Sequence, residues 1–247
     1  MAKNKPNKAV LLLLLVIGLV GGGYAVWDST LKHEFFPRNF GVIVEDQAYR
    51  SGRLTPRALR SVIEDHQIKT ILDLGAFELD SPKDQEQQRI AEEMGVTRFR
   101  MPNLIGDGTG NPNEFAHAVR MINDPRAWPI LVHCGAGTQR MGATTVLHRC
   151  LIEGLTVEEA YREAFTYGHE PRTDWEMLAF IGTHDESIAQ SLRTGKPVPG
   201  YATTPYPLGE PPLLDVADRS VTRVAGQLEQ TSTERDEPDA DTPDPGA

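Results

Sequence analysis

The sequence predicts a single three-layer α/β domain, in which helices flank a mainly parallel sheet. Short apolar segments alternate with amphipathic segments from about residue 40 to residue 202, which is the pattern of such a sheet. The two ends differ from the middle in charge balance: residues 1–27 hold three lysines and no acidic residue, whereas acidic residues dominate residues 203–247. The chain has two cysteines among 247 residues, which excludes a disulfide-stabilised scaffold.

The expected strands are short apolar segments bounded by turn residues. Ile68–Leu74 (IKTILDL) is apolar enough to be buried on both faces, as is typical of a strand inside a parallel sheet. Parallel neighbours require a crossover connection, which is usually a helix, and helical patterns do separate most of these segments. In chain order, strands are expected at residues 41–45, 48–50, 68–74, 96–101 and 130–133.

The expected helices begin at capping residues. Thr55 precedes Pro56, and Ser81 precedes Pro82, so each pair supplies an N-cap and a proline suited to the first turn. Thr156 opens a further helix whose fourth residue along, Glu159, completes a capping box. In chain order, helices are expected at residues 56–66, 82–95 (closed by Gly95), 112–123, 139–152, onward from Thr156, and about 174–192.

Residues 1–27 are interpreted as an N-terminal membrane anchor. The 19 uncharged residues 9–27 would rise about 28 Å as a helix, close to the hydrocarbon thickness of a bilayer. The lysines before this segment favour an N-terminus in the cytoplasm, which would make the chain a single-pass membrane protein with an extracytoplasmic domain. A cleaved signal peptide is the alternative interpretation.

Residues 203–247 are predicted to form a mostly disordered acidic tail. They hold ten acidic residues, three arginines and seven prolines, and no aromatic residue follows Tyr206. Such a segment buries too little apolar surface to offset the entropy of ordering. The folded domain is therefore expected to span residues 28–202. A net charge of −10 argues against a nucleic-acid binder, which would carry a basic surface.

Residues 129–142 (PILVHCGAGTQRMG) combine a buried strand, a glycine-containing loop and a helix start. Ligands of open α/β sheets bind beyond the carboxyl ends of the strands, and loop amides with a helix N-terminus form an anion site there. The same field stabilises a thiolate at Cys134, and Arg140 can bind two oxygens of a phosphate. The expected substrate-binding residues lie between these two side chains: Gly135, Ala136, Gly137, Thr138 and Gln139.

The segment HCGAGTQR resembles the HCxxGxxR signature of the cysteine-dependent protein tyrosine phosphatase superfamily. The wider chain resembles the dual-specificity-like branch, because YRSGRL (49–54), IKTILDL (68–74) and TVEEAYRE (156–163) occur in the family's order. The resemblance implies a phosphatase for phosphorylated proteins or small phosphomonoesters such as phosphotyrosine, without metal or cofactor. Residues 134–140 are called the signature loop below.

The resemblance also assigns roles to individual residues. Cys134 would attack phosphorus to form a thiophosphate, while Arg140 and the loop amides would stabilise the equatorial oxygens. His133 would help to hold the thiolate. An aspartic acid on a movable loop would protonate the leaving oxygen and then activate water.

Asp107 is the expected general acid. It lies 27 residues before Cys134 in the segment NLIGDGTGN, whose glycines suit a loop that closes over substrate. The alternative is an aspartate that only stabilises a turn. Asp124 is a rival, but its position before Pro125 is typical of turn chemistry.

The chain departs from the family pattern next to the arginine and in the strand before it. Met141 stands where relatives have a serine or threonine that assists departure of the thiolate, which predicts slow breakdown of the intermediate unless Thr138 or Thr144 substitutes. Gly75 stands where relatives often have an arginine. The uncharged loop favours a substrate with one phosphate. Other candidates for lining the pocket are Arg50, Arg53, Lys69 and Arg100.

Two other functions fit parts of the pattern. A non-catalytic phosphate-binding module fits the methionine after the arginine, and a rhodanese-like sulfurtransferase also uses a cysteine-and-arginine loop. A metal site is excluded by distance, because about 15 Å of helix would separate the two ends of the cluster. That cluster would comprise His133, Cys134, His148 and Cys150.

Overall fold

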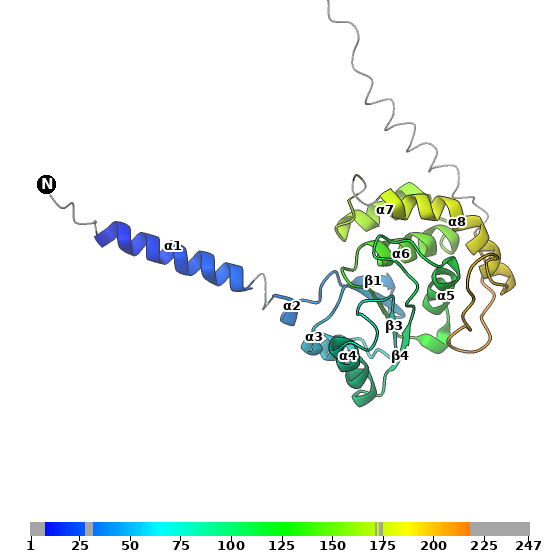
Figure 1. Ribbon diagram of the computed structural model, residues 1–247, viewed down its shortest axis with the longest axis horizontal. Helices are drawn as coiled ribbons and strands as arrows, with labels where there is room; N and C mark the ends of the chain where they lie inside the picture. Colours follow the sequence, from blue (N-terminus) through cyan, green and yellow to red (C-terminus); the bar gives the residue numbers. More distant parts are fainter. Residues whose placement is uncertain (1–7, 28–31, 171, 173–174, 218–247) are drawn as a thin grey trace, which may run out of the picture.

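The computed structural model describes residues 8–27, 32–170, 172 and 175–217 (Figure 1). The described strands form one five-stranded sheet with the order β1-β2-β5-β3-β4. The strands are β1 (Gly41–Val44), β2 (Ala48–Ser51), β3 (Thr70–Asp73), β4 (Thr97–Arg100) and β5 (Ile130–His133). The helices are α1 (Lys8–Val26), α2 (Lys32–Phe35), α3 (Pro56–Asp65), α4 (Pro82–Glu93), α5 (Pro112–Ile122), η2 (Pro125–Ala127), α6 (Gln139–Leu151), α7 (Val157–Thr166) and α8 (Trp175–Thr194).

The sheet is mixed, with one antiparallel edge. β1 pairs antiparallel with β2, and the pairs β2–β5, β5–β3 and β3–β4 are all parallel. The predicted single α/β domain with a mainly parallel sheet is therefore confirmed. The parallel pairs bring the carboxyl ends of β2, β3 and β5 to one edge, because Ser51 and Asp73 both lie opposite His133.

Helices cover both faces of the sheet (Figure 1). Ile71 and Leu131 belong to a buried cluster with apolar residues of α3 and α4. Leu72 and Val132, their chain neighbours, belong to the other cluster, with residues of α5, α6, α7 and α8. Successive strand residues point to opposite faces, so this alternation produces a three-layer domain with two cores.

The helix starts follow the capping residues that the sequence predicted. The Thr55 hydroxyl accepts a hydrogen bond from the Ala58 amide at 3.2 Å, at the start of α3. Thr156 and Glu159 form the predicted capping box of α7, with bonds of 3.3 and 2.9 Å. Residue 174, the predicted start of the last helix, lies outside the described residues, and α8 is described from Trp175.

The membrane anchor predicted for residues 9–27 does not find support. Helix α1 forms over most of this segment, but within the described chain no helix is at once long and apolar enough to cross a bilayer. The apolar run itself ends at Val20, before three glycines, and its eleven residues would rise only about 16 Å. The single-pass topology and the extracytoplasmic placement of the domain depended on that anchor and lose their support with it.

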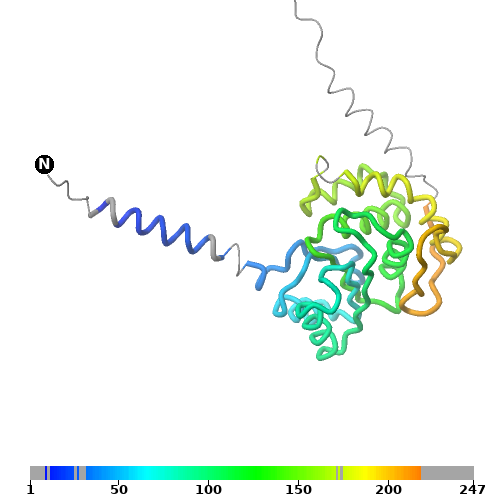
Figure 2. The backbone as a smooth tube through the Cα atoms, viewed as in Figure 1, coloured from blue at the N-terminus to red at the C-terminus, as the bar shows by residue number. Residues whose placement is uncertain are grey.

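Residues 203–217, called the C-terminal strap here, pack on the domain beside α5 (Figure 2, orange). The side chain of Tyr206 is 5% exposed, and its hydroxyl donates to Asp124 Oδ2 at 3.0 Å. The Ala217 amide donates to the Leu151 carbonyl at 2.8 Å. The folded chain therefore extends past the predicted boundary at residue 202, because the strap's few apolar side chains find partners on the domain. Residues 218–247 of the predicted tail lie outside the described residues.

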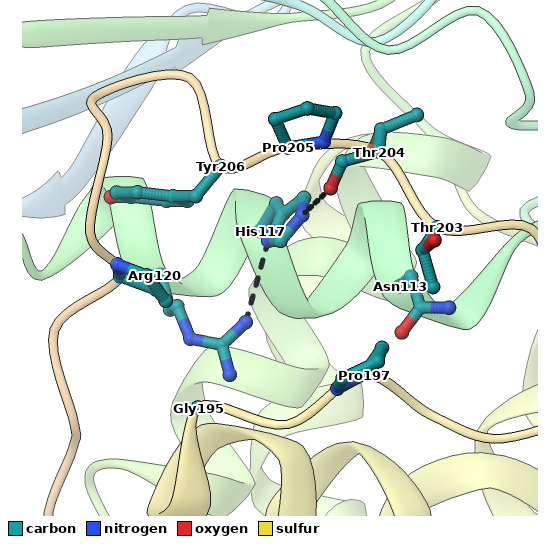
Figure 3. A pocket seen from close by; sticks show the side chains of 10 residues that line it. Asn113, His117, Arg120, Gly195, Pro197, Thr203, Thr204, Pro205 and Tyr206 are labelled. Carbon is teal, nitrogen blue, oxygen red and sulfur yellow. Dashed lines mark hydrogen bonds between the residues drawn. The ribbon is translucent and has the colours of Figure 1, made fainter.

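A cavity of about 420 Å³ lies between the strap and α5 (Figure 3). His117 spans it, with a contact of 2.9 Å to the Thr204 carbonyl and a hydrogen bond of 3.3 Å to Arg120. Arg120 in turn donates to the carbonyl of Ser191 in the last turn of α8, at 2.5 Å. These bonds tie the strap, α5 and α8 together, and no residue of the signature loop lines this cavity.

Candidate active site

The signature loop follows β5 at the carboxyl edge of the sheet, as the sequence predicted. Three consecutive carbonyl groups of the loop are bound by donors from other parts of the chain. Carbonyls that point outward leave the amides of the same peptides facing inward, which is the arrangement of an anion-binding loop. The three bonds are Arg53 N to Gly135 O (2.9 Å), Asn39 Nδ2 to Ala136 O (2.9 Å) and Arg50 Nη2 to Gly137 O (2.8 Å).

Cys134 lies inside this ring of amides. Its side chain is 2% exposed, and the Gly137 amide donates to Cys134 Sγ at 3.2 Å. Helix α6 begins at Gln139, so the positive end of its dipole also faces the loop. A thiolate at Cys134, or an oxyanion bound beside it, would be stabilised by the same donors.

Two glycines from separate motifs make the loop geometry possible. Gly137 has φ of +78°, and a Cβ atom there would lie 2.7 Å from the Gly52 amide nitrogen. A Cβ atom on Gly52 would lie 2.7 Å from the Ala136 carbonyl oxygen. The end of β2 therefore packs backbone to backbone against the loop, which explains why a YRSG segment accompanies the cysteine motif.

Arg140 presents one edge of its guanidinium to the loop. Its Nη1 donates to the carbonyls of Leu74, at 2.7 Å, and Gly75. The Nε atom has no hydrogen-bond partner in the described part of the protein. A Cβ atom on Gly135 would lie 3.3 Å from Arg140 Nη2. The Nε–Nη2 edge, which is the edge that binds two oxygens of a phosphate, is thus the one directed at the loop.

Asp73 organises the turn that holds Arg140. Its carboxylate accepts from the Ala76 amide at 2.5 Å and from Arg98 at 2.5 Å, and Ala76 directly follows the two residues whose carbonyls Arg140 binds. Burial opposes ionisation of Asp73, but His133, the Ala76 amide and Arg98 outweigh it, so the pKa of Asp73 is lowered overall. The turn after β3 is therefore fixed by a buried carboxylate.

His133 lies opposite Asp73 in the sheet register and is 2% exposed. Burial lowers the pKa of His133, although the Asp73 carboxylate acts in the opposite direction. Neither ring nitrogen has a hydrogen-bond partner among the described residues. The structure thus brings His133 next to Cys134 in the chain and next to Asp73 in space, while its predicted effect on the thiolate stays a prediction.

Asp107 lies in the loop before α5, half-buried. Its carboxylate accepts from the Thr109 amide at 2.9 Å and from the Thr109 hydroxyl at 2.7 Å, which is the pattern of a turn aspartate. The neighbouring Gly108 is packed against the signature loop, because a Cβ atom there would lie 3.1 Å from the Gln139 carbonyl oxygen. Asp107 therefore lies one residue from a contact with the loop, and its role as the acid stays a prediction.

The rival aspartate is far less suited to proton transfer. Asp124 is 2% exposed and forms an ion pair of 2.6 Å with Arg126, besides accepting from Tyr206. Burial would raise its pKa, but the bonds from Arg126 and Tyr206 lower it overall. Asp124 is thus a structural carboxylate at the strap.

The hydroxyl groups near Met141 are engaged elsewhere. Met141 is fully buried in the core. The Thr138 hydroxyl donates to the Gln139 side chain, and the Thr144 hydroxyl donates to the Arg140 carbonyl at 2.9 Å. The donor to Cys134 Sγ is the backbone amide of Gly137, so neither threonine takes the place of the missing serine or threonine in this conformation.

Of the four basic side chains proposed to line the pocket, Arg53 reaches the loop: its Nη2 lies 3.4 Å from a Cβ position on Gly135. Arg50 is fully buried beneath the loop, where its guanidinium stacks 3.6 Å from the Tyr167 ring centroid. Lys69 precedes β3 at the opposite edge of the sheet. Arg100 forms an ion pair with Asp84. Those three predictions of pocket-lining residues were wrong.

Sequence reasoning missed Asn39 and the structural role of Arg50. Asn39 has φ of +48° and donates to both Ala136 O and Tyr167 O, at 2.9 and 3.2 Å. It therefore links the loop to the end of α7. The left-handed backbone is a conformation that asparagine tolerates, but a lone asparagine before a strand carries no such signal in the sequence.

Comparison with known proteins finds similarity to phosphatases. No protein-family model matches the chain. The tyrosine-protein phosphatase-like protein OCA2 of Saccharomyces cerevisiae is 24% identical over 155 residues, which is 60% of this chain and 76% of that protein. Among solved structures, the core catalytic domain of the PP-IP phosphatase SIW14 from S. cerevisiae, in complex with citrate, superposes with a TM-score of 0.52 and 19% identity, covering 64% of this chain and 94% of that one. TpbA of P. aeruginosa in complex with pTyr has a TM-score of 0.50 and 16% identity, covering 61% and 88%.

The fold and the loop define an α/β domain with a cysteine-centred anion site at the carboxyl edge of a parallel sheet. In sequence the chain is similar to a tyrosine-protein phosphatase-like protein of yeast. It shares its fold with solved cysteine-based phosphatases, and the HCGAGTQR loop resembles the signature of the cysteine-dependent protein tyrosine phosphatase superfamily.

Proposed function

We propose that the chain hydrolyses phosphate monoesters through a cysteinyl-phosphate intermediate. The observation that carries this proposal is the arrangement around Cys134. Its sulfur accepts a bond from the Gly137 amide at 3.2 Å, inside a loop whose carbonyls are turned away. Arg140 directs its unoccupied Nε–Nη2 edge at the same loop. Nucleophile, amide donors and bidentate cation thus converge on one phosphate-sized anion.

The reaction divides into two displacements at phosphorus. Cys134 Sγ, as a thiolate, forms the S–P bond while the P–O bond to the leaving group breaks, and Asp107 gives its proton to the leaving oxygen. Water then forms a new P–O bond, the S–P bond breaks, and Asp107 takes up a proton from that water. Inorganic phosphate leaves and the thiolate is restored. Release of the Asp107 carboxylate from Thr109 would accompany closure of its loop over the substrate.

The substrate class that we favour is phosphotyrosine or a similar phosphomonoester. The four variable loop residues, Gly135, Ala136, Thr138 and Gln139, are uncharged, so the loop itself contacts one phosphate. A structure of TpbA, which shares this fold, holds pTyr. A second candidate function is a non-catalytic phosphate-binding module, which is favoured by the engagement of Asp107 with Thr109.

Hydrolysis of an aryl phosphate by the full chain tests the proposal. We expect Cys134→Ser to abolish turnover, whereas Cys150→Ala, the matched control, leaves it intact. Burial raises the pKa of Cys150 to about 12, so that thiol stays protonated and unreactive. Asp107→Asn should lower kcat by about 10²-fold or more. Full activity in Cys134→Ser would refute the mechanism, and binding of phosphotyrosine without release of phosphate would favour the non-catalytic module.

A further inference from the structure

A second cavity, of about 310 Å³, opens beside the signature loop and is basic. It lies between the loop after β2, the turn after β3 and the first turn of α4. Its charged or titratable lining comprises four basic groups and one carboxylate, and its apolar wall includes the ring of Phe77. These charged or titratable groups are His33, Arg38, Arg53, Lys83 and Glu86.

The cations of this cavity are unpaired, unlike those elsewhere in the domain. Within the described ranges, Arg38, Arg53 and Lys83 form no ion pair. By contrast, Arg98 and Arg100 on β4 are both held by carboxylates. The chain has more acidic residues (35) than basic ones (25), so carboxylates are abundant enough to pair with every cation. A cluster of cations without carboxylate partners therefore creates a local positive potential.

Lys83 has a second unusual feature. It lies in the first turn of α4, where the helix dipole is positive and a cation is unfavourable. The carboxylate of this turn, Asp84, is already held by Arg98 and Arg100, so the helix end and the lysine add to the same positive potential. That arrangement is stabilised when an anion lies in front of it.

Arg53 connects this cavity to the site of catalysis. Its amide donates to the Gly135 carbonyl at 2.9 Å, and its Nη2 lies 3.4 Å from the position of a Cβ on Gly135. The Nη2 of Arg140 lies 3.3 Å from that same position. Its guanidinium is also held over the Phe77 ring, 5.0 Å from the centroid, so its direction is fixed. A group bound at Arg53 would be an immediate neighbour of the reacting phosphate.

We propose that this cavity binds a second anionic group of the substrate, so that the preferred substrate is a phosphomonoester with a further acidic group close to the phosphate. The proposal rests on the proposed function and adds the substrate feature that sets specificity. It also revises the inference from the loop: the loop residues are uncharged, but Arg38, Arg53 and Lys83 supply charge from outside it. The second anion is a carboxylate or a phosphate, supplied by a peptide or by a small molecule.

Two matched pairs of probes test the proposal on the full chain. Phenyl phosphate is compared with a benzene bisphosphate, and a phosphotyrosine peptide with neutral neighbours is compared with the same peptide with aspartates beside the phosphotyrosine. We expect kcat/KM to be at least about tenfold higher for the doubly anionic member of one pair, mainly through KM, because its second anion makes a further charge-assisted hydrogen bond. Preference within the first pair identifies a small molecule as the source, and preference within the second identifies a peptide.

In the variants Arg53→Met and Lys83→Met, the ratio of kcat/KM between the two members of a pair should fall toward a value of one. The dependence of this ratio on salt concentration should weaken as well. Arg162→Met is the control, because Arg162 is an exposed cation on α7 that pairs with Glu158 and does not line the cavity. Equal kcat/KM within both pairs, or equal losses on both members in the variants, would overturn the proposal while leaving the phosphatase function standing.

Binding separates failure of the inference from failure of the proposed function. In Cys134→Ser, which cannot turn over, calorimetry should still show tighter binding of the doubly anionic probe, and Arg53→Met in that background should remove the difference. That result supports the second subsite even if the wild-type chain hydrolyses none of the probes. Equal affinities for both members of each pair would refute it.

Discussion

At the scale of single residues, the two cysteines differ in what surrounds the sulfur. Cys150 lies in the core on α6, where burial, with Asp185 and Glu159, raises the pKa of its thiol to about 12. Cys134 lies among inward-facing amides, one of which donates to its sulfur. The two equally buried thiols thus lie in different surroundings: an amide donates to the sulfur of Cys134, whereas burial disfavours the thiolate of Cys150.

Met141 leads to a prediction about the second chemical step. The hydroxyls of Thr138 and Thr144 bond other groups, so departure of the thiolate from phosphorus is assisted by the Gly137 amide but by neither of these hydroxyls. We expect the intermediate to form faster than it breaks down. Stopped-flow measurement should show a burst of aryl alcohol stoichiometric with enzyme, followed by slower steady-state turnover. Linear release from the first turnover would contradict this, and Met141→Ser should shrink the burst.

Asp73→Asn should impair the chemistry from a distance. The substitution removes the charge that binds Arg98 and weakens the bond from the Ala76 amide, which orders the turn whose carbonyls hold Arg140. We expect kcat/KM to fall by up to about 10²-fold, as misplacement of a catalytic group does, and the free energy of unfolding to fall by about 3–5 kcal/mol. Steady-state kinetics and urea unfolding measure the two effects. Arg89→Ala, which breaks only exposed ion pairs, should change neither.

The buried side chains of His133 and Asp73 predict how the stability of the fold depends on pH. The pKa of His133 is lowered by burial, so the unfolded state takes up that proton first, and stability falls as the pH drops below about 6.5. The pKa of Asp73 is lowered overall, so its contribution is present above about pH 4 and is lost as the pH falls through its lower folded value. Urea unfolding from pH 8 to pH 3 should show both losses, and Asp73→Asn should remove the second. An unchanged acid profile in that variant would contradict the assignment.

The signature loop itself was predictable from the sequence, but the residues that support it were not. Cys134, Arg140 and the glycines between them lie within seven consecutive residues, and a short segment is visible as a pattern. Asn39 and Arg50 bind the same loop across 97 and 87 residues of sequence, so their roles depend on the fold. Arg53 could be named only as one of four possible cations, because exposure and direction are three-dimensional properties.

At the scale of elements, local chemistry decided the helix ends and long-range packing decided the strand ends. Thr55, Ser81 and Thr156 each cap a helix as predicted, since a cap needs only the next three residues. The strand predicted at 68–74 is shorter in the structure, Thr70–Asp73, because its length is set by pairing with β4 and β5. The signal for a helix end is local, whereas the signal for a strand end lies in its neighbours.

The contact between β2 and the signature loop gives a prediction at this scale. Gly52→Ala would place a Cβ 2.7 Å from the Ala136 carbonyl oxygen, and backbone on both sides cannot move without shifting the loop. We expect the free energy of unfolding to fall by about 1–3 kcal/mol. We also expect kcat/KM to fall by more than the fraction of unfolded protein accounts for, because the loop is displaced in the folded protein. Gly18→Ala is the control, because a Cβ there meets no atom within 4 Å. Normal turnover in Gly52→Ala would show that the loop is not held by this contact.

At the scale of the whole molecule, the acidic net charge and the anion site are compatible because the charges are unevenly distributed. Residues 203–247 hold ten acidic residues against three arginines, which is most of the excess. Unpaired cations gather instead in the cavity beside the signature loop. The average charge therefore describes the acidic C-terminal segment better than it describes the site.

Composition placed the end of the folded domain at residue 202, but the C-terminal strap packs on the domain up to residue 217. Truncation of the chain tests whether the strap stabilises the fold. Ending the chain after residue 202 removes the Tyr206 bond to Asp124 and the strap carbonyls of Leu208 and Glu210 that Arg126 binds. It also exposes the apolar surface that Tyr206 covers. We expect a loss of about 3 kcal/mol in the free energy of unfolding, from one buried aromatic side chain and the hydrogen bonds around it.

Ending the chain after residue 217 keeps every one of these contacts and is the matched control. Urea unfolding should give the same midpoint for residues 1–217 as for the full chain, and a lower midpoint for residues 1–202. Tyr206→Phe in the full chain should lose only about 1 kcal/mol, since the ring still packs and a single hydrogen bond is removed. Equal midpoints for the two truncations would mean that the strap lies on the domain without stabilising it, and the folded unit would then end near residue 202, as composition alone suggests.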